Sequence, residues 1–328
     1  MLRYTLRRLA LALPLALGVA TLAFVLIETA PGEPADLLLG SGPIPPEVRE
    51  RLDRAYGFDR PAPERYVRWL GALTLRGELG WSHARNRPVR DLVAAALPPT
   101  MLLAGSALLM HLAAGIALGV VSAARRGRWA DRGIGFAGLL LYAMPTFWLG
   151  LMAILALTYL VPLFPAASMR SVGAEAWGPA RRLLDLLWHL VLPASVLGIA
   201  SAAAMTRFVR AGLLEALGEP FIRAARARGA GDRRVMLGHA LRNALIPVIS
   251  LVGLSLPILV SGSLVTEVVF AWPGMGRLTY DAIRAQDVSV VLAATLLAAL
   301  LVVAGNLAAD LAIAAVDPRV RVRRETSR

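Results

Sequence analysis

The chain of 328 residues contains no cysteine and no lysine, and only four of its residues are histidine. Without cysteine it can form neither disulfides nor thiolate metal sites, and it lacks a cysteine nucleophile. Without lysine it cannot build the phosphate-binding loop of a P-loop ATPase, which requires a lysine beside the phosphates. The four histidines are isolated and show no HExxH spacing, so the sequence does not indicate metal chemistry.

Charged side chains are also missing from six long apolar stretches. The whole chain is 57% hydrophobic and has a mean hydropathy of +0.61. Each stretch approaches or exceeds the ~20 residues needed to cross a bilayer as a helix. They are residues 9–27, 92–124, 133–169, 186–206, 243–266 and 288–309. The sequence therefore predicts an all-α integral membrane protein with six transmembrane helices and both termini on one side. The first stretch is longer than a signal-peptide core and others follow, which favours an uncleaved first span.

Arginine supplies all 35 basic residues, and the net charge of +13 is unevenly distributed. Net charges of +3, +3, +5 and +3 belong to residues 1–8, 123–133, 206–243 and 317–328. The alternate segments 28–97, 162–188 and 267–287 sum to zero. By the positive-inside rule, both termini and the arginine-rich loops are cytoplasmic. The basicity then reflects topology and not a nucleic-acid partner, since no basic face is interleaved with exposed aromatic residues.

Four regions follow from this pattern. They are a first transmembrane helix with a short cytoplasmic N-terminus (1–28), an extracytoplasmic segment with short helices (29–93), a five-helix transmembrane core with a cytoplasmic loop at 207–243 (94–316), and a basic cytoplasmic tail (317–328). Within the extracytoplasmic segment, prolines precede two expected helices, one at 47–56 and one carrying Tyr66 and Trp69. This segment either stabilises the bundle or docks a partner outside the membrane.

Proline positions suggest where two of the membrane helices begin or bend. Pro98 and Pro99 are expected at the start of the second transmembrane helix, where a missing N–H has no cost. Pro145 lies inside the third apolar stretch and predicts a kink there.

The cytoplasmic loop has the pattern of an amphipathic helix. Leu214, Leu217, Phe221 and Ala225 recur at helical spacing and predict one helical stripe, with the arginines 223, 226 and 228 on the other surface. Gly229 ends the pattern and suits a left-handed C-cap.

Asp232 is then expected to N-cap a second helix that leads back into the membrane. Such a basic face can lie against anionic lipid or fit a groove on another protein. The face of small residues, the glycine break and the immediate return to the membrane favour the groove.

A second motif follows the fifth apolar stretch, at residues 270–276. It is interpreted as an interfacial aromatic anchor with a turn, or as an outer gate. Its residues are Trp272, Pro273, Gly274 and Gly276.

Residues 223–229 (Arg-Ala-Ala-Arg-Ala-Arg-Gly) resemble the EAA loop of ABC-importer permeases, in particular the B-type permease of the dipeptide, oligopeptide and nickel systems. Other matching motifs follow in order along nearly the whole chain. They are residues 31–34, 145–149, 192–193, 270–276, Asn306 with Asp310, and 317–319. Two departures from the broader EAA pattern, Arg223 in place of Glu and Leu241-Arg242 in place of Leu-Pro, are familiar in the B-type branch. Glu215 or Glu219 is an alternative source of the acidic group.

The resemblance implies a bacterial or archaeal plasma-membrane subunit with no cofactor of its own. It pairs with a second, C-type permease in the membrane lipid. One or two cytoplasmic ABC ATPases bind ATP and Mg, and an extracytoplasmic binding protein delivers the substrate, expected to be a peptide. The residues implied in coupling to the ATPase are Glu215, Glu219, Phe221, Arg223, Ala224, Ala225, Arg226 and Gly229.

Within this implied coupling helix, Phe221 and Ala225 are expected to fill a groove on the ATPase. Arg223 and Arg226 are expected to contact its acidic rim, while Gly229 permits the turn.

Two other classes of protein are weighed against this interpretation. An ATP-independent secondary transporter usually carries ionisable groups within the membrane, and Asp310 is interpreted as the only acid in or beside a predicted span. An intramembrane hydrolase is a weaker alternative, because Ser195, Ser201 and His189 share a span without a GxSxG motif.

Overall fold

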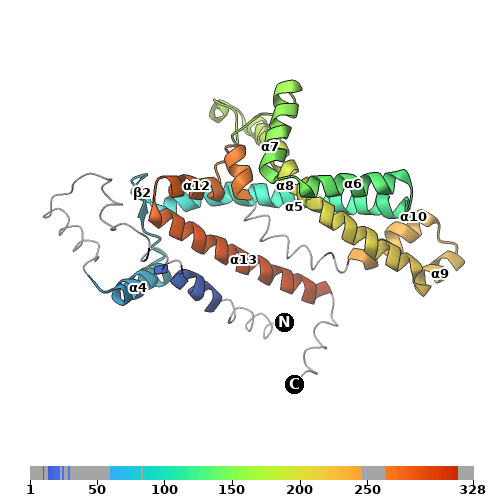
Figure 1. Ribbon diagram of the computed structural model, residues 1–328, viewed down its shortest axis with the longest axis horizontal. Coiled ribbons are helices and arrows are strands. Elements are labelled where there is room, and N and C mark those ends of the chain that lie inside the picture. The colour runs from blue at the N-terminus through green and yellow to red at the C-terminus, as the bar shows by residue number, and fades with distance from the viewer. Residues whose placement is uncertain are drawn as a thin grey trace, which may run out of the picture.

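The computed structural model describes residues 60–82, 84–245 and 263–316, together with residues 10, 14–22, 24, 25, 29 and 248. The elements in chain order are α4 (Ala62–Gly71), η1 (Ala72–Arg76), β1 (Trp81–Ser82), β2 (Arg87–Pro88), α5 (Val89–Ala124), α6 (Trp129–Ala143), α7 (Thr146–Ile154), η2 (Leu155–Leu160), η3 (Ala174–Ala176), α8 (Pro179–Gly218), α9 (Pro220–Ala227), α10 (Asp232–Arg234), η4 (Val235–Ala240), α12 (Met275–Arg284) and α13 (Val288–Val316). Figure 1 shows them as an elongated assembly of helices with one small hairpin.

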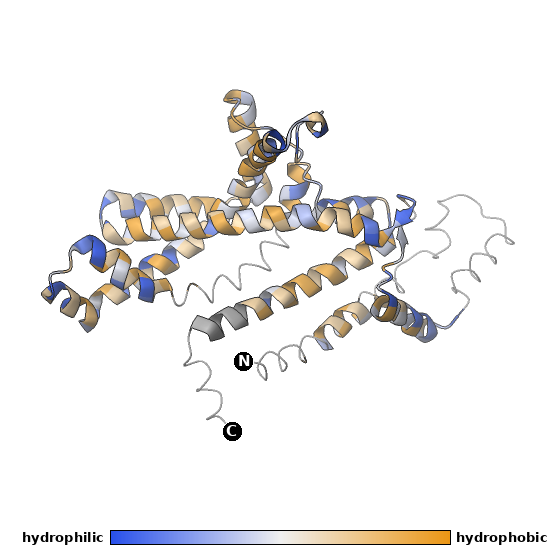
Figure 2. Ribbon diagram, turned by 180° about the vertical axis from the view of Figure 1, so that it is seen from behind, coloured by the Kyte–Doolittle hydropathy of each residue, from blue (hydrophilic) through white to orange (hydrophobic). Residues whose placement is uncertain are grey.

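Three described helices are long and apolar enough to cross a membrane: α5, α8 and α13 up to Ala308. The pair Trp129–Ala143 and Thr146–Leu160 makes a fourth if it counts as one broken span. Figure 2 shows hydrophobic residues along the long helices and hydrophilic residues gathered toward their ends. Seven of the 19 residues of the predicted first span (9–27) and most of the predicted fifth span (243–266) lie outside the described residues, so the number six stays a prediction.

The break between α6 and α7 confirms the kink predicted at Pro145, and the bend reaches 105°. Met144 adopts an extended conformation (φ −82°, ψ 135°) because a following proline disfavours helical backbone. α7 therefore projects away from the line of α6 (Figure 1).

α5 and α8 form a long pair that runs in the same direction and organises the rest of the described chain. A Cβ atom added at Gly198 would lie 2.6 Å from the carbonyl oxygen of Ala107. One added at Gly119 would lie 2.7 Å from Cβ of Val209. The two backbones can approach this closely only because glycine occupies both positions, as is common between membrane helices.

The start of α5 differs from the sequence prediction. The helix begins at Val89, so Pro98 and Pro99 lie inside it and not at its first turn. Val89 is fully buried against α12 and α13, and this packing holds the helix together before the prolines. The loss of two backbone donors is the kind of defect that membrane helices tolerate when neighbouring groups serve the freed carbonyls.

The predicted helix after Pro61 is confirmed as α4, which begins directly after Pro61. Its Tyr66 and Trp69 rings lie 5.3 Å and 5.8 Å from the ring of Phe24, and Tyr66 shares a 2.6 Å hydrogen bond with Thr21. α4 thus packs against the first apolar stretch. The other expected helix, at 47–56, lies outside the described residues.

Three apolar clusters follow one another along α5. The first joins the start of α5 to α12 and α13, and the second joins its next turns to α8 and Trp272. The third joins Ala123 at its end to the end of α8, α9 and η4. The cytoplasmic loop and the turn at 270–276 therefore belong to opposite ends of the assembly (Figure 1).

Candidate functional site

The loop at residues 207–243 contains two helices where the sequence predicted one continuous stripe from Leu214 to Ala225. α8 ends at Gly218, and α9 begins at Pro220. Glu219 between them is extended, with φ −72° and ψ 150°. The single-helix prediction was wrong because Pro220 disfavours helical backbone at the residue before it.

α9 is anchored to its own subunit by its apolar side. Ile222 is fully buried and Ala225 is 1% exposed. Ile222 packs in a cluster with residues of α8 and η4, including Leu213, Ala216 and Val235. The short helix is therefore held by side-chain packing and not by its own hydrogen bonds, which are too few to stabilise an isolated helix of this length.

The opposite side of α9 is open. Phe221 is 38% exposed, and Arg223, Ala224 and Arg226 are also exposed. Glu219 is exposed at the start of α9, whereas Glu215 is exposed on the last turns of α8. Of the residues implied in coupling, the structure thus leaves most exposed. The expectation that Ala225 fills a groove on the ATPase was wrong, because Ala225 is 1% exposed within its own subunit.

Gly229 is confirmed as a left-handed residue, with φ +83°. The Gly229 N–H donates to the carbonyl oxygen of Arg226 at 2.9 Å, and the Ala230 N–H donates to that of Ala225 at 3.1 Å. These bonds close α9 and turn the chain toward α10. Glycine is favoured because other residues are strained at positive φ.

The predicted N-cap at Asp232 was wrong by one residue. Gly231 occupies the N-cap of α10 without a side-chain hydrogen bond, and Asp232 is the first helical residue. The Asp232 side chain is 97% exposed and lies 3.8 Å from Nη2 of Arg226. A carboxylate in the first turn still interacts favourably with the helix dipole.

At the other end of the assembly, residues 270–276 form a tightly packed turn. Trp272 is fully buried, and its indole N–H donates to the carbonyl oxygen of Pro99 at 2.9 Å. Gly274 is buried, Gly276 is partly buried and Pro273 is exposed. A side chain at Gly274 would collide with Glu267 and Thr100, so this glycine is required by a close approach.

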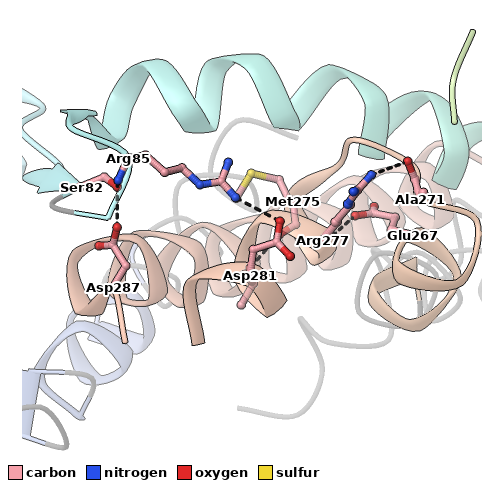
Figure 3. A network of polar contacts seen from close by, with 9 residues as sticks. Ser82, Arg85, Glu267, Ala271, Met275, Arg277, Asp281 and Asp287 are labelled. Carbon is pink, nitrogen blue, oxygen red and sulfur yellow. Dashed lines mark hydrogen bonds and ion pairs between the residues drawn. The ribbon is translucent and has the colours of Figure 1, made fainter. Parts of the chain in front are cut away.

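Glu267 organises this turn and was missed from the sequence. Its carboxylate is fully buried and accepts hydrogen bonds from the Thr100 hydroxyl at 2.7 Å, the Gly276 N–H at 2.7 Å and the Arg277 N–H at 3.1 Å. Thr100 in turn accepts from the Met275 N–H at 2.7 Å. The first three N–H groups of α12, which a helix leaves without partners, are therefore all satisfied. Figure 3 shows Arg277 beside the Glu267 carboxylate.

Glu267 corrects the interpretation that Asp310 is the only acid in or beside a predicted span. It directly follows the predicted fifth span, and its acceptors are occupied by structural donors. The signal that could have found it is an acid five residues before a Trp-Pro-Gly turn that opens a helix.

The hairpin β1–β2 docks on the same surface. The Ser82 hydroxyl donates to the buried carboxylate of Asp287, and Arg85 Nη2 lies 3.1 Å from Oδ2 of Asp281 (Figure 3). Both contacts join the segment before α5 to α12 and the start of α13. At this end of the described chain, the hairpin, α12 and the start of α13 are thus held together by polar contacts.

No group of three or more His, Asp or Glu that could hold a metal ion occurs in the part of the chain that the structure describes. The arrangement thus consists of the anchored helix α9 at one end and the packed turn at residues 270–276 at the other. Nothing in this geometry resembles a set of catalytic groups.

Comparison with known proteins agrees with this geometry. Residues 115–322 match the family described as binding-protein-dependent transport system inner membrane component, and residues 1–104 match the N-terminal family of the same membrane components. The chain belongs to this family. It is an ABC-importer permease, a multi-pass inner-membrane subunit and a transport protein, not an enzyme. The alternative of a secondary transporter is thereby set aside.

Relatives cover the permease almost from end to end. The oligopeptide transport system permease protein AppB of Bacillus subtilis is 39% identical over 98% of this chain and 99% of its own length. The dipeptide transport system permease protein DppB of Escherichia coli K12 is 34% identical over 98% of this chain and 99% of its own length. The glutathione transport system permease protein GsiC of Escherichia coli O6:H1 is also 34% identical, over 98% of this chain and 100% of its own length.

A solved structure of the MetNI methionine ABC transporter in inward-facing conformations contains a chain of similar fold. The TM-score is 0.53 at 19% identity, and the match covers 70% of this chain and 97% of that one. At this identity the likeness concerns the fold alone. It places the described helices within the architecture of an ABC-importer permease.

Proposed function

We propose that this permease imports peptides and that α9 is the surface against which a cytoplasmic ABC ATPase docks. The substrate class is inferred from relatives whose names refer to oligopeptide, dipeptide and glutathione transport. Binding-protein-dependent importers work with an ATPase and a substrate-binding protein. In this proposal the ATPase binds ATP and Mg, because the chain has no lysine for a phosphate-binding loop.

One observation carries the docking proposal, namely the two-sided construction of α9. Its inner side is fixed by Ile222 and Ala225, while Phe221, Arg223 and Arg226 are exposed on the outer side. A short amphipathic helix with an aromatic anchor and arginines fits an apolar groove with an acidic rim. Lipid contact alone gives no reason for anchoring so short a helix against η4 and α8.

The direct connection of α9 to α8 supports a mechanical role. ATP-driven closure of the ATPases would displace α9, and α8 would carry the displacement into the membrane as a rigid element. A second, C-type permease would form the other half of the path, with one or two ATPases below. The binding protein would dock outside, where residues 29–93 lie if both termini are cytoplasmic, as the arginine distribution favours.

Purification of the permease from its native membranes in mild detergent, followed by mass spectrometry, tests this proposal. We expect a second permease, one or two ATPases and, when the complex is captured with its substrate, a binding protein. The double variant Arg223→Glu with Arg226→Glu is expected to lose the ATPases, because it places negative charge against an acidic rim.

The matched control is Arg125→Glu with Arg126→Glu, which reverses two exposed arginines in the other described cytoplasmic loop. This control is expected to retain the ATPases. Recovery of the chain alone, or equal ATPase recovery from both double variants, would contradict docking at α9.

A further inference from the structure

Asp131 and Arg210 form a two-pronged ion pair between α6 and α8. Arg210 Nε donates to Oδ1 of Asp131 at 2.8 Å, and Arg210 Nη2 donates to Oδ2 at 2.8 Å. Asp131 is 8% exposed, whereas the Arg210 side chain is 35% exposed, so the pair has a buried carboxylate and a partly exposed guanidinium. Paired parallel bonds of this kind fix the orientation of both groups as well as their separation.

The same carboxylate also ties together the turn between α5 and α6. Oδ1 accepts from the hydroxyl of Ser122, near the end of α5, and Oδ2 accepts from the Gly127 N–H at 2.9 Å. Each oxygen of Asp131 therefore accepts two hydrogen bonds. One side chain joins the end of α5, the α5–α6 turn and the start of α6 to a single guanidinium on α8.

The other contacts between these helices each join two elements. Nδ1 of His111 on α5 lies 2.9 Å from the hydroxyl oxygen of Ser201 on α8, and the guanidinium of Arg207 on α8 lies 5.7 Å from the ring of Tyr142 on α6. A Cβ atom added at Gly138 of α6 would lie 3.4 Å from Cβ of Ala203 on α8, an ordinary packing distance. Among the described residues, Asp131 with Arg210 is the ion pair that joins α8 to α6 and to the α5–α6 turn at once.

The position of the pair links it to the cytoplasmic helix. Arg210 precedes Leu213 and Ala216 on α8, two residues that pack in one cluster with Ile222 of α9. A displacement of α9 reaches α8 through that cluster, and Arg210 lies on the next turns of α8 toward the membrane. The α5–α6 turn is thus connected to α9 through one chain of buried contacts.

We propose that the Asp131–Arg210 pair is a positioning element for energy coupling, which makes α5, α6 and α8 follow the displacement of α9 as one body. Because α9 is where we propose that the ATPase docks, this role depends on that docking. Without the pair, α9 and α8 move while the α5–α6 turn lags, so ATP is hydrolysed with less transport.

The experiment uses the complete transporter in proteoliposomes with spin labels at Arg126→Cys, on the α5–α6 turn, and Ala227→Cys, at the end of α9. The subunit has no other cysteine, so the labels are specific within it. In the parent complex, the distance between labels is expected to change by less than about 2 Å between nucleotide-free and ATP–vanadate states. In Arg210→Gln and Arg210→Lys it is expected to change by more than about 5 Å.

Transport is measured in the same vesicles, without the labels, with an isotope-labelled mixture of peptides of two to six residues. The amount of peptide transported per ATP is expected to fall about tenfold in Arg210→Gln. The double variant Asp131→Asn with Arg210→Gln is expected to be no worse than the more defective single variant, because both changes break one pair. Arg182→Gln, which changes an exposed arginine near the start of the same helix whose hydrogen bond goes to the nearby carbonyl of Trp177, is the control expected to behave like the parent.

The outcomes separate this proposal from ATPase docking. The Arg210 variants are expected to retain their ATPases, whereas the variants on α9 lose them. An unchanged peptide-to-ATP ratio and an unchanged label distance in both Arg210 variants would overturn the positioning role. If the Arg210→Gln complex does not assemble, Arg210→Lys, which keeps the charge and loses the two-pronged geometry, decides the question.

Discussion

Glu267 shows how one buried charge can hold several segments together. It has no exposed surface, and the donors that surround it belong to α5 and to the start of α12. Burying a carboxylate is favourable only when its oxygens accept hydrogen bonds. When the carboxylate is removed, the N–H and O–H groups that donated to it are left without partners. The turn at residues 270–276 therefore depends on this side chain.

We predict that Glu267→Ala lowers the free energy of unfolding by about 3 kcal/mol, since it leaves buried N–H groups without acceptors. The measurement is the thermal unfolding of the purified complex in mild detergent. The control is Asp281→Ala, which breaks a contact between Arg85 and Asp281 whose side chains are 39% and 45% exposed. This exposed pair is expected to contribute less than about 1 kcal/mol. Equal melting of the two variants would contradict the role of Glu267.

Gly229 and Gly231 offer a comparison within the turn after α9. Gly229 has φ +83°, whereas Gly231 has φ −66° and ψ 158°, and neither has an atom within 4 Å of an added Cβ. Gly229→Val is thus strained by backbone conformation alone, at a cost of about 1–2 kcal/mol or more. We predict that it abolishes ATPase activity coupled to transport while the subunit still inserts.

Gly231→Val is the matched control, because valine accepts the extended conformation found there. It is expected to support coupled ATPase activity close to that of the parent. Similar activity in both valine variants would show that the left-handed turn has no part in coupling.

Contacts between residues that lie far apart in the sequence could not be predicted. Thr100 and Glu267 are 167 positions apart, and Asp131 and Arg210 are 79 apart. No local periodicity connects such pairs, so an acid beside an apolar stretch looks like an ordinary boundary residue. Gly229 was predictable because the conformation of a turn is set by neighbouring residues, and the exposure of the α9 arginines followed from helical spacing.

At the scale of elements, the α5–α8 pair depends on where glycine occurs. An added Cβ at Gly119 would lie 2.7 Å from both Cβ and Cγ1 of Val209, while one at Gly105 on the same helix would meet no atom within 4 Å. We predict opposite effects of alanine at these two positions. Gly119→Ala should destabilise the complex by about 2 kcal/mol through overpacking.

Gly105→Ala should instead be neutral or stabilise α5 by up to about 1 kcal/mol, through helix propensity. Thermal unfolding of the two variants in the same detergent measures the difference. Destabilisation by Gly105→Ala equal to that by Gly119→Ala would contradict the close approach of α5 and α8.

Element boundaries were harder to predict than element types. The apolar spacing of Leu214, Leu217 and Phe221 continues across two helices, so it concealed the break at Glu219. The start of α5 was placed at its prolines, although burial of Val89 carries the helix farther toward the N-terminus. The residue before Pro220 decided the first boundary, and tertiary packing decided the second. The hydropathy pattern indicates neither boundary.

At the scale of the whole molecule, the described helices separate two braced ends. The cytoplasmic helix α9 belongs to one end, and α12 with the hairpin belongs to the other (Figure 1). The membrane class and the bend at Pro145 were predictable, because hydropathy and proline act along the chain. The proposed sidedness, with α9 in the cytoplasm and α12 outside, rests on the arginine distribution.

Cross-linking from single cysteines tests the central proposal most directly, since the subunit contains no cysteine of its own. A photoactivatable thiol reagent is attached at Phe221→Cys on α9, or at Arg284→Cys at the exposed end of α12, in the assembled transporter. We predict that position 221 forms an adduct with the ATPase and that position 284 forms none. An ATPase adduct from position 284, or its absence from position 221, would contradict docking at α9.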